Sequence, residues 1–250
     1  MPRKTAVLKD PLFLEHDPGY DHVESPERLT AIYQALAQEK GEAYLFPECE
    51  PASYDDLAAN HTPEHIERVA ETAGKQFDVL DPDTYTSPQS YEAAVLAAGA
   101  VITGLKLVAS GQADNAAALV RPPGHHAEAD RAKGFCLFNN IAVGARYGLK
   151  HLGMERIFIL DWDLHHGNGT QHSFYDTDQV LYCSTHQYPL YPGTGSLKET
   201  GTGKGEGYNL NVPLPGGQGD QDFARIVDEL VAPVARQYRP DCIMVSAGYD

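Results

Sequence analysis

Asp163 and His165 are separated by a single residue within the polar run 161–169. In an extended segment, residues two apart point to the same side, so this carboxylate and this imidazole can bind one metal ion. Asp250 follows another apolar run and is the candidate for a third ligand. Two carboxylates and one imidazole leave a coordination position open, as catalytic zinc sites do. An isolated Asp-x-His more often caps a loop, but the polar run around this one favours a metal site.

His125 and His126 are adjacent and follow an Arg-Pro-Pro-Gly turn. A neutral imidazole near a metal-bound water is a suitable general base, because its ordinary pKa lies close to neutral pH. Asp161 lies two residues before Asp163 and could accept a hydrogen bond from one of these histidines, which would fix its tautomer. Either histidine alone would more often be structural, whereas the pair beside a metal motif favours acid–base chemistry.

The polar turns all follow short apolar runs, which predict strands that are buried on both faces of a parallel sheet. These runs are 116–120, 157–160, 180–183 and 243–245, and 208–214 is a further candidate strand. Ligands bind at the carboxyl ends of the strands in open parallel sheets. The turns are therefore expected to converge on one crevice.

Helices are predicted between these strands from capping signals and apolar spacing. Ser-Pro or Thr-Pro pairs open segments at 25–39, 62–74 and from 87 onward, and an amphipathic helix covers 223–234, where Pro233 should kink or end it. No linker or repeat divides the chain. The expected fold is α/β, a three-layer αβα single domain over 1–250 with a mainly parallel sheet and helices on both faces.

The composition narrows the class of partner. The chain has 250 residues, with 19 Lys+Arg against 35 Asp+Glu and a net charge of −16. This balance argues against a nucleic-acid partner and weakly favours a cationic small molecule or a basic peptide. The longest apolar stretch, 93–105, is shorter than the ~18–20 residues of a membrane span, so no membrane partner is expected. Without a signal peptide or a Cys-x-x-Cys pair, the expected location is the cytoplasm.

Five ordered motifs carry a family resemblance. They are RPPGHHA at 121–127, GFCLFNN at 134–140, ILDWDLHHGNGTQ at 159–171, YPGTG at 191–195 and SAGYD at 246–250. In these segments the chain resembles the zinc-dependent histone deacetylase family of the arginase/deacetylase superfamily. It is most similar to the bacterial class II-like, deacetylase-like amidohydrolases.

The resemblance implies a role for each matching residue. Asp163, His165 and Asp250 match the zinc ligands, and His125 and His126 match the tandem catalytic histidines. Asp161 matches the carboxylate behind His125, and Asn168 matches the partner of His126. The residues that match substrate-binding positions are Phe135, Tyr191, Asp83 and Gly134, the first two as walls of an acyl-lysine tunnel and Asp83 at its rim. An inner potassium site is implied at Asp161, Asp163, His165, Ser184 and Thr185, and an outer one at Phe174, Thr177, Val180 and Tyr208.

The implied activity is zinc-dependent hydrolysis of an N-acetyl amide, chiefly acetyl-lysine in proteins or peptides. The alternatives are an acetylpolyamine amidohydrolase and a non-catalytic module that binds acyl-lysine. Arginase-like enzymes carry a second metal on another carboxylate, and Gly167 stands at that position here. One zinc ion per chain is therefore expected, together with structural potassium.

Members of this family continue beyond the position of Asp250 and carry a tyrosine or histidine there that donates to the oxyanion. No counterpart is found in this sequence. The chain is therefore expected to lack the C-terminal part of the domain, and its own activity is expected to be weakened, since one oxyanion donor is typically worth ~10²–10³ in rate.

Overall fold

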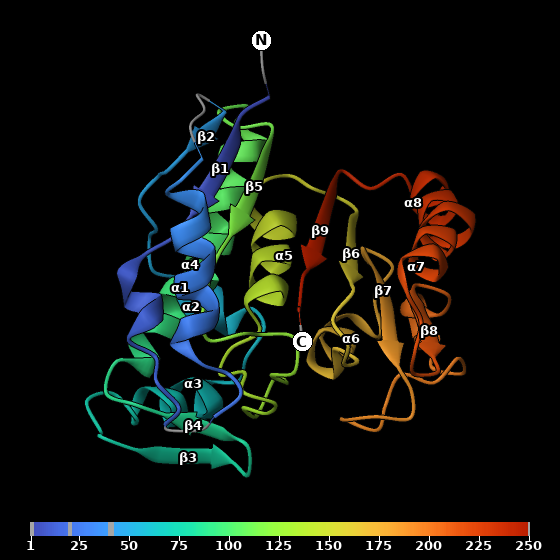
Figure 1. Cartoon of the computed structure of the whole chain (residues 1–250). Helices are drawn as coiled ribbons and strands as arrows, with labels where there is room; N and C mark the ends of the chain where they lie inside the picture. Colours follow the sequence, from blue (N-terminus) through green and yellow to red (C-terminus); the bar gives the residue numbers. More distant parts are fainter. Residues whose placement is uncertain (1–2, 20–21, 40–42, 250) are drawn as a thin grey trace. The chain divides into compact units, whose positions relative to one another are not determined.

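The computed structural model of the protein describes residues 3–19, 22–39 and 43–249. The chain forms two compact units, Met1–Gly148 and Leu149–Asp250, and each is described here by itself. Figure 1 shows the elements of both units.

The first unit contains a three-stranded parallel sheet in the order β2-β1-β5. Its strands are β1 (Thr5–Leu8), β2 (Tyr44–Leu45) and β5 (Asn115–Ala118). The long helix α4 (Ser90–Ala109) packs against β1 and β5, and its small buried residues allow a close approach. Leu8 and Phe13 are fully buried in the resulting core.

Helix α4 is long and apolar enough to cross a membrane by length and composition alone. Within the first unit, however, it is a core helix. The backbone of Glu50 to Ala52 lies so close to Gly99 that a Cβ there would overlap it. Ala52 N–H also donates to the carbonyl of Val95, at 3.1 Å.

Three further helices and a hairpin complete the first unit. They are α1 (Pro26–Leu36), α2 (Tyr54–Ala58), α3 (Pro63–Ala70) and the antiparallel pair β3 (Asp78–Asp81) and β4 (Thr84–Thr86). The Thr62 hydroxyl caps α3 by accepting from His65 N–H, as the Thr-Pro signal predicts. Helix α5 (Asn140–His151) follows and ends in the second unit.

The second unit contains a four-stranded parallel sheet in the order β8-β7-β6-β9. Its strands are β6 (Ile157–Asp161), β7 (Val180–Gln187), β8 (Asn209–Leu214) and β9 (Cys242–Ser246). Phe158, Leu181 and Cys183 pack with the helical segment 220–238, and α6 (Asn168–Phe174) contacts β7. The parallel pairing of β6 with β7 and with β9 places the carboxyl ends of these three strands side by side.

The helical segment 220–238 continues past Pro233, where the sequence predicts a kink or an early end. Helix α7 (Asp220–Ile226) and helix α8 (Ala232–Tyr238) are joined by a π-helical turn at Val227–Val231. Proline cannot donate the intrahelical hydrogen bond and its ring clashes with the preceding turn. The wider π turn accommodates it without ending the helix.

The predicted strands are all present, but two differ in burial. β6 and β7 are buried almost throughout, as expected. In contrast, β5 begins with two exposed residues and β9 exposes Ile243 and Val245, so the prediction that both are buried on two faces is wrong. Each of these strands is the last in its sheet among the described residues, where neighbouring elements cover it less. The helices at 25–39 and 62–74 are also shorter than predicted.

Candidate active site

The turn that carries the tandem histidines is buried in the first unit. His125 and His126 are 8% and 4% exposed, and their ring centroids are 4.0 Å apart. The Asn140 amide donates to the Pro122 carbonyl at 3.1 Å, and the Asn139 amide donates to the Ala127 carbonyl at 3.2 Å. The turn is thus held on both sides of the two rings by the residues that start α5.

Gly134 and Phe135 form a strained corner beside His126. Both have positive φ angles, 55° and 68°, which are unfavourable for a residue with a side chain. A Cβ at Gly134 would overlap the His126 ring, so only glycine allows the chain to approach it. The corner is held through its two N–H groups, because Gly134 donates to Asp83 Oδ1 at 3.1 Å and Phe135 donates to Thr84 Oγ1 at 3.0 Å.

The structure therefore brings together all five predicted site residues of the first unit: Asp83, His125, His126, Gly134 and Phe135. Asp83 was predicted at the rim as a group that holds the substrate backbone. Its Oδ1 accepts hydrogen bonds from Gly134 N–H and, at 2.9 Å, from the Thr84 hydroxyl. Asp83 is thus a support of the Phe135 corner, and its contact with a substrate stays a prediction.

Two buried histidines that the sequence analysis did not single out support this region. His61 Nδ1 donates to the Glu128 carbonyl at 3.0 Å, and its Nε2 accepts from Asn139 N–H at 2.9 Å. His65 Nε2 donates to the Leu137 carbonyl at 2.8 Å. Burial, followed by the neighbouring His65, lowers the pKa of His61 to about 3, and burial also lowers the pKa of His65. Their four-residue spacing at the start of α3 is the one sequence signal that could have linked them.

In the second unit, Asp163 and His165 lie together after β6, as predicted. Asp163 Oδ1 accepts from His165 N–H at 2.7 Å and lies 3.3 Å from His165 Nδ1. Asp163 is nearly buried, whereas the His165 side chain is 27% exposed. The ring of Tyr191 packs edge-on against His165 with centroids 6.0 Å apart. A solvent-accessible imidazole thus lies beside a buried carboxylate and a predicted tunnel residue.

The segment that follows β9 contacts Asp163 directly. A Cβ at Gly248 would overlap Asp163 Oδ2 and its carboxyl carbon. Trp162 N–H also donates to the Ser246 carbonyl at 3.2 Å, which joins the two strand ends. Asp250, the predicted third ligand, lies outside the described residues, two positions beyond Gly248.

The donors present fit a zinc ion. Ligand atoms ~2.0–2.1 Å from a tetrahedral ion lie roughly 3.3 Å apart, which matches the separation of Asp163 Oδ1 and His165 Nδ1. The absence of a side chain at Gly248 is what allows the turn after β9 to lie against Asp163 Oδ2. No group of three His, Cys, Asp or Glu suited to a metal occurs within 3–19, 22–39 and 43–249. Asp250, the third predicted ligand, lies outside these ranges, and its place in the set stays a prediction.

Asp161 is fully buried at the end of β6. Its Oδ1 accepts from Asp163 N–H at 3.2 Å and its Oδ2 accepts from the Tyr182 hydroxyl at 3.0 Å. Burial, and then the charge of Asp161, raise the pKa of Tyr182 well above its usual value, so the phenol stays protonated as a donor. Asp161 and Ser184 are direct partners in the register of β6 and β7.

The residues predicted for potassium occupy two regions of the second unit. Ser184 and Thr185 are buried near the carboxyl end of β7, beside Asp161. Thr185 Oγ1 finds no hydrogen-bond partner in the part of the chain that the structure describes. The outer set lies at the other end of the sheet, where α6 ends and β7 and β8 begin: Phe174, Thr177, Val180 and Tyr208.

The loop that carries Tyr191 is held by a buried polar network. Glu199 accepts from the N–H groups of Gly195 and Ser196 and from the Gln171 amide. Burial raises the pKa of Glu199, but these hydrogen bonds outweigh it and the net shift is downward. His186 Nε2 donates to the Gly195 carbonyl at 2.9 Å. His186 is thus buried within β7 and fixes the loop from the strand side.

The predicted site combines residues of both units. His125 and His126 belong to the first unit, whereas Asp161, Asp163, His165 and Asn168 belong to the second. Asn168 is buried at the start of α6. Its pairing with His126, the pairing of Asp161 with His125, and the approach of both histidines to the metal ligands stay predictions.

A family model described as a histone deacetylase domain matches residues 22–250. The chain belongs to the histone deacetylase family. The match spans both units and contains every predicted site residue.

Relatives from several kingdoms support this membership. A probable deacetylase of Archaeoglobus fulgidus is 43% identical over 98% of this chain and 69% of its own length. A histone deacetylase-like amidohydrolase of Pseudomonas aeruginosa is 38% identical over the whole of this chain and 71% of its own length. The yeast histone deacetylase HDA1 is 40% identical, but the chain covers only 36% of it.

The crystal structure of the HDA15 HD domain has the same fold. It matches with a TM-score of 0.95 and 39% identity, over 99% of this chain and 72% of the HDA15 domain. This match confirms the predicted α/β fold of the arginase/deacetylase type, with its mainly parallel sheets and flanking helices.

Proposed function

We propose that this protein is a zinc-dependent deacetylase that hydrolyses an N-acetyl amide, with acetyl-lysine in a peptide or protein as its main substrate. The observation that carries the proposal is the Asp163–His165 pair, with donor atoms 3.3 Å apart and the turn after β9 in contact with Asp163. Family membership supplies the reaction class.

Asp163, His165 and Asp250 would hold the zinc ion. When bound, zinc polarises the amide carbonyl and lowers the pKa of a water molecule. His125 and His126 would do the proton transfers: one ring removes a proton from the attacking water and the other helps protonate the leaving amine. Their burial and their close, tilted contact would keep both rings in a fixed orientation.

Phe135 and Tyr191 would form the walls that enclose the acyl-lysine stem. A narrow apolar passage suits a neutral acyl amide and keeps out water. Asp83 and Gly134 would support the Phe135 wall through the hydrogen bond between them. Potassium would bind at the inner and outer sets named above, and the ion at the inner set would support the turn after β6.

The test is turnover together with metal content. The purified protein should contain one zinc ion per chain and should release the fluorophore from an acetyl-lysine substrate. Asp163→Asn and His165→Ala should abolish both zinc and turnover. Zinc-free, inactive protein that still binds acyl-lysine would show a non-catalytic binding module instead.

An acetylpolyamine is the second candidate substrate, favoured by the net charge of −16. Competition between an acetyl-lysine peptide and acetylputrescine should separate the two, since the better substrate inhibits turnover of the other at lower concentration. We also propose the cytoplasm as the location, where the thiols of Cys49, Cys136, Cys183 and Cys242 would stay reduced.

A further inference from the structure

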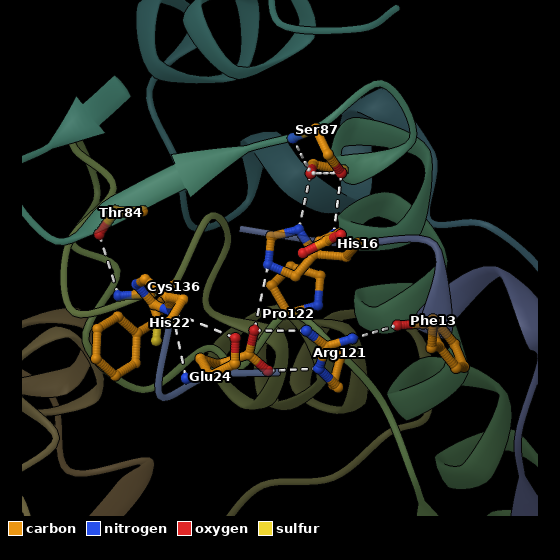
Figure 2. A network of polar contacts seen from close by, with 12 residues as sticks. Phe13, His16, His22, Glu24, Thr84, Ser87, Arg121, Pro122 and Cys136 are labelled. Carbon is orange, nitrogen blue, oxygen red and sulfur yellow. Dashed lines mark hydrogen bonds and ion pairs between the residues drawn. The ribbon is translucent and has the colours of Figure 1, made fainter. Parts of the chain in front are cut away.

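Arg121, the first residue of the histidine turn, forms a buried ion pair with Glu24. Arg121 Nη2 donates to Glu24 Oε2 at 2.7 Å, and Arg121 Nε donates to Oε1 of the same carboxylate. The third guanidinium nitrogen, Nη1, donates to the Phe13 carbonyl at 2.9 Å. Both charged side chains are at most 5% exposed. Figure 2 shows this network in the first unit.

His16 is the next member of the network. Its Nδ1 lies 2.7 Å from Ser90 Oγ and its Nε2 lies 3.5 Å from Glu24 Oε2. Burial, followed by the nearby charge of Arg121, lowers the pKa of His16 to about 3. The imidazole is therefore neutral at pH 7 and acts on Glu24 as a dipole rather than as a counter-charge.

Electrostatics favour one tautomer of His16. Ser90 Oγ accepts from Ser87 N–H at 2.7 Å and lies 2.7 Å from His16 Nδ1 and 3.0 Å from Ser87 Oγ. A proton on Nε2 is favourable beside Glu24, because in the opposite tautomer a lone pair would face the carboxylate. At 3.5 Å from Glu24 Oε2, His16 Nε2 forms no hydrogen bond among the described residues. Glu24 is thus hydrogen-bonded by Arg121 on one side and faced by the neutral His16 ring on the other.

The same N-terminal segment also reaches the Phe135 corner. The ring of His22 packs edge-on against Phe135 with centroids 4.9 Å apart, and its Nε2 lies 3.3 Å from the Asp83 carbonyl. Figure 2 shows His22 beside Glu24. Glu24 therefore contacts the start of the histidine turn, and His22 contacts the aromatic wall.

We propose that Glu24 and His16 are positioning residues for the tandem histidines. They hold the Arg121 guanidinium, and so fix the start of the turn that orients His125 and His126. This proposal rests on the proposed function, in which those two rings transfer protons. A buried ion pair can often be replaced by apolar residues without loss of stability. Stability and positioning can therefore be separated by experiment.

The test compares Glu24→Gln with Glu50→Gln, which breaks the exposed ion pair with Lys106 in the same unit. The zinc-loaded protein is assayed for kcat, KM and thermal midpoint. We expect Glu24→Gln to lower kcat about 100-fold with KM changed less than threefold, because small displacements of catalytic groups act on kcat. Glu50→Gln should change neither. Equal kcat values for the two variants would overturn the proposal.

A double variant separates positioning from folding. Glu24→Leu with Arg121→Met replaces the ion pair by apolar side chains of similar size, and should recover the thermal midpoint but not kcat. Recovery of both would overturn the proposal. His16→Gln leaves no charge unpaired and provides a second route if the double variant does not fold. It should lower kcat at least tenfold, and an unchanged kcat would count against a positioning role.

Amide hydrogen exchange gives a readout that does not depend on turnover. Residues 121–127 should exchange faster in Glu24→Gln than in Glu50→Gln, and equal rates would overturn the proposal. If the unmodified protein is inactive on both substrates while 121–127 loosens as expected, the proposed function fails and the positioning of the turn stands.

Discussion

Gly248 leaves no space for a side chain beside Asp163. A methyl group at position 248 would overlap the Asp163 carboxylate, because the turn after β9 lies directly on the turn after β6. These two turns were expected to meet, since they follow neighbouring parallel strands at the same edge. The contact is therefore a direct means to disturb the proposed zinc ligand without changing it.

Gly248→Ala should weaken zinc binding about 10–100-fold, the usual effect of disturbing the surroundings of a metal ligand. The added Cβ forces either Asp163 or the turn after β9 to move. The measurement is zinc affinity by competition with a chelator, together with kcat/KM on acetyl-lysine. Gly216→Ala is the matched control, because a Cβ there makes only ordinary 3.5 Å contacts with Gln187. Equal zinc affinity in the two variants would contradict the prediction.

The sequence was sufficient to locate most of the candidate site. The Asp-x-His spacing, the tandem histidines and the apolar runs before them depend on local rules of strand geometry, and each of these residues lies where a strand or turn was expected. Glu24, His16 and His61 could not be found in this way. Their roles depend on contacts with residues more than 60 positions away, such as Arg121 and Glu128, which local spacing does not encode.

The same limit applies to the fold. β6 and β7 were predicted as buried strands because continuous apolar runs are typical of central parallel strands. β5 and β9 have similar runs but lie at the ends of the described sheets, and their exposure depends on sheet order rather than on local sequence. The effect of Pro233 was foreseeable, whereas its accommodation by a π turn depends on packing against Phe158 and Leu181.

Gly134→Ala should lower kcat about 100-fold, since the added Cβ would push against the His126 ring and displace it. Zinc content should stay at the unmodified level, because His126 is not a proposed ligand. Gly111→Ala is a close control. Gly111 has a similar positive φ of 72° but open space around it. An alanine there therefore introduces the same backbone strain without overlapping any neighbour. A comparable loss of kcat in both variants would show that strain alone is responsible.

Thr84→Val should destabilise the protein by about 1–3 kcal/mol, because it leaves the Phe135 N–H without its acceptor. Phe135 would then relax from its positive φ, and KM for acetyl-lysine should rise as the tunnel wall moves. Thr86→Val on the same strand is the control. Thr86 Oγ1 is buried and has no hydrogen-bond partner among the described residues, so its replacement should be neutral or stabilising. Unfolding in urea measures the stability of each variant. An equal loss of stability in Thr84→Val and Thr86→Val would contradict the proposed support of Phe135.

Stability should fall as the pH is lowered from about 6.5 toward 5. Burial holds the pKa of His16 and of His61 at about 3 in the folded chain, while both ordinary values are 6.5. In this window the unfolded chain protonates His16 and His61, whereas the folded chain keeps both neutral. The free energy of unfolding therefore decreases with decreasing pH, by up to about 1.4 kcal/mol per pH unit for each histidine.

Urea unfolding at pH 7, 6, 5.5 and 5 measures this slope above the range in which carboxylates titrate. His61→Gln should make the slope shallower, since one buried histidine no longer binds a proton on unfolding, while His65 and His186, whose pKa values burial also lowers, still contribute. A stability that is constant from pH 6.5 to 5 would mean that His16 and His61 are not held neutral by burial, and the tautomer assigned to His16 would lose its basis.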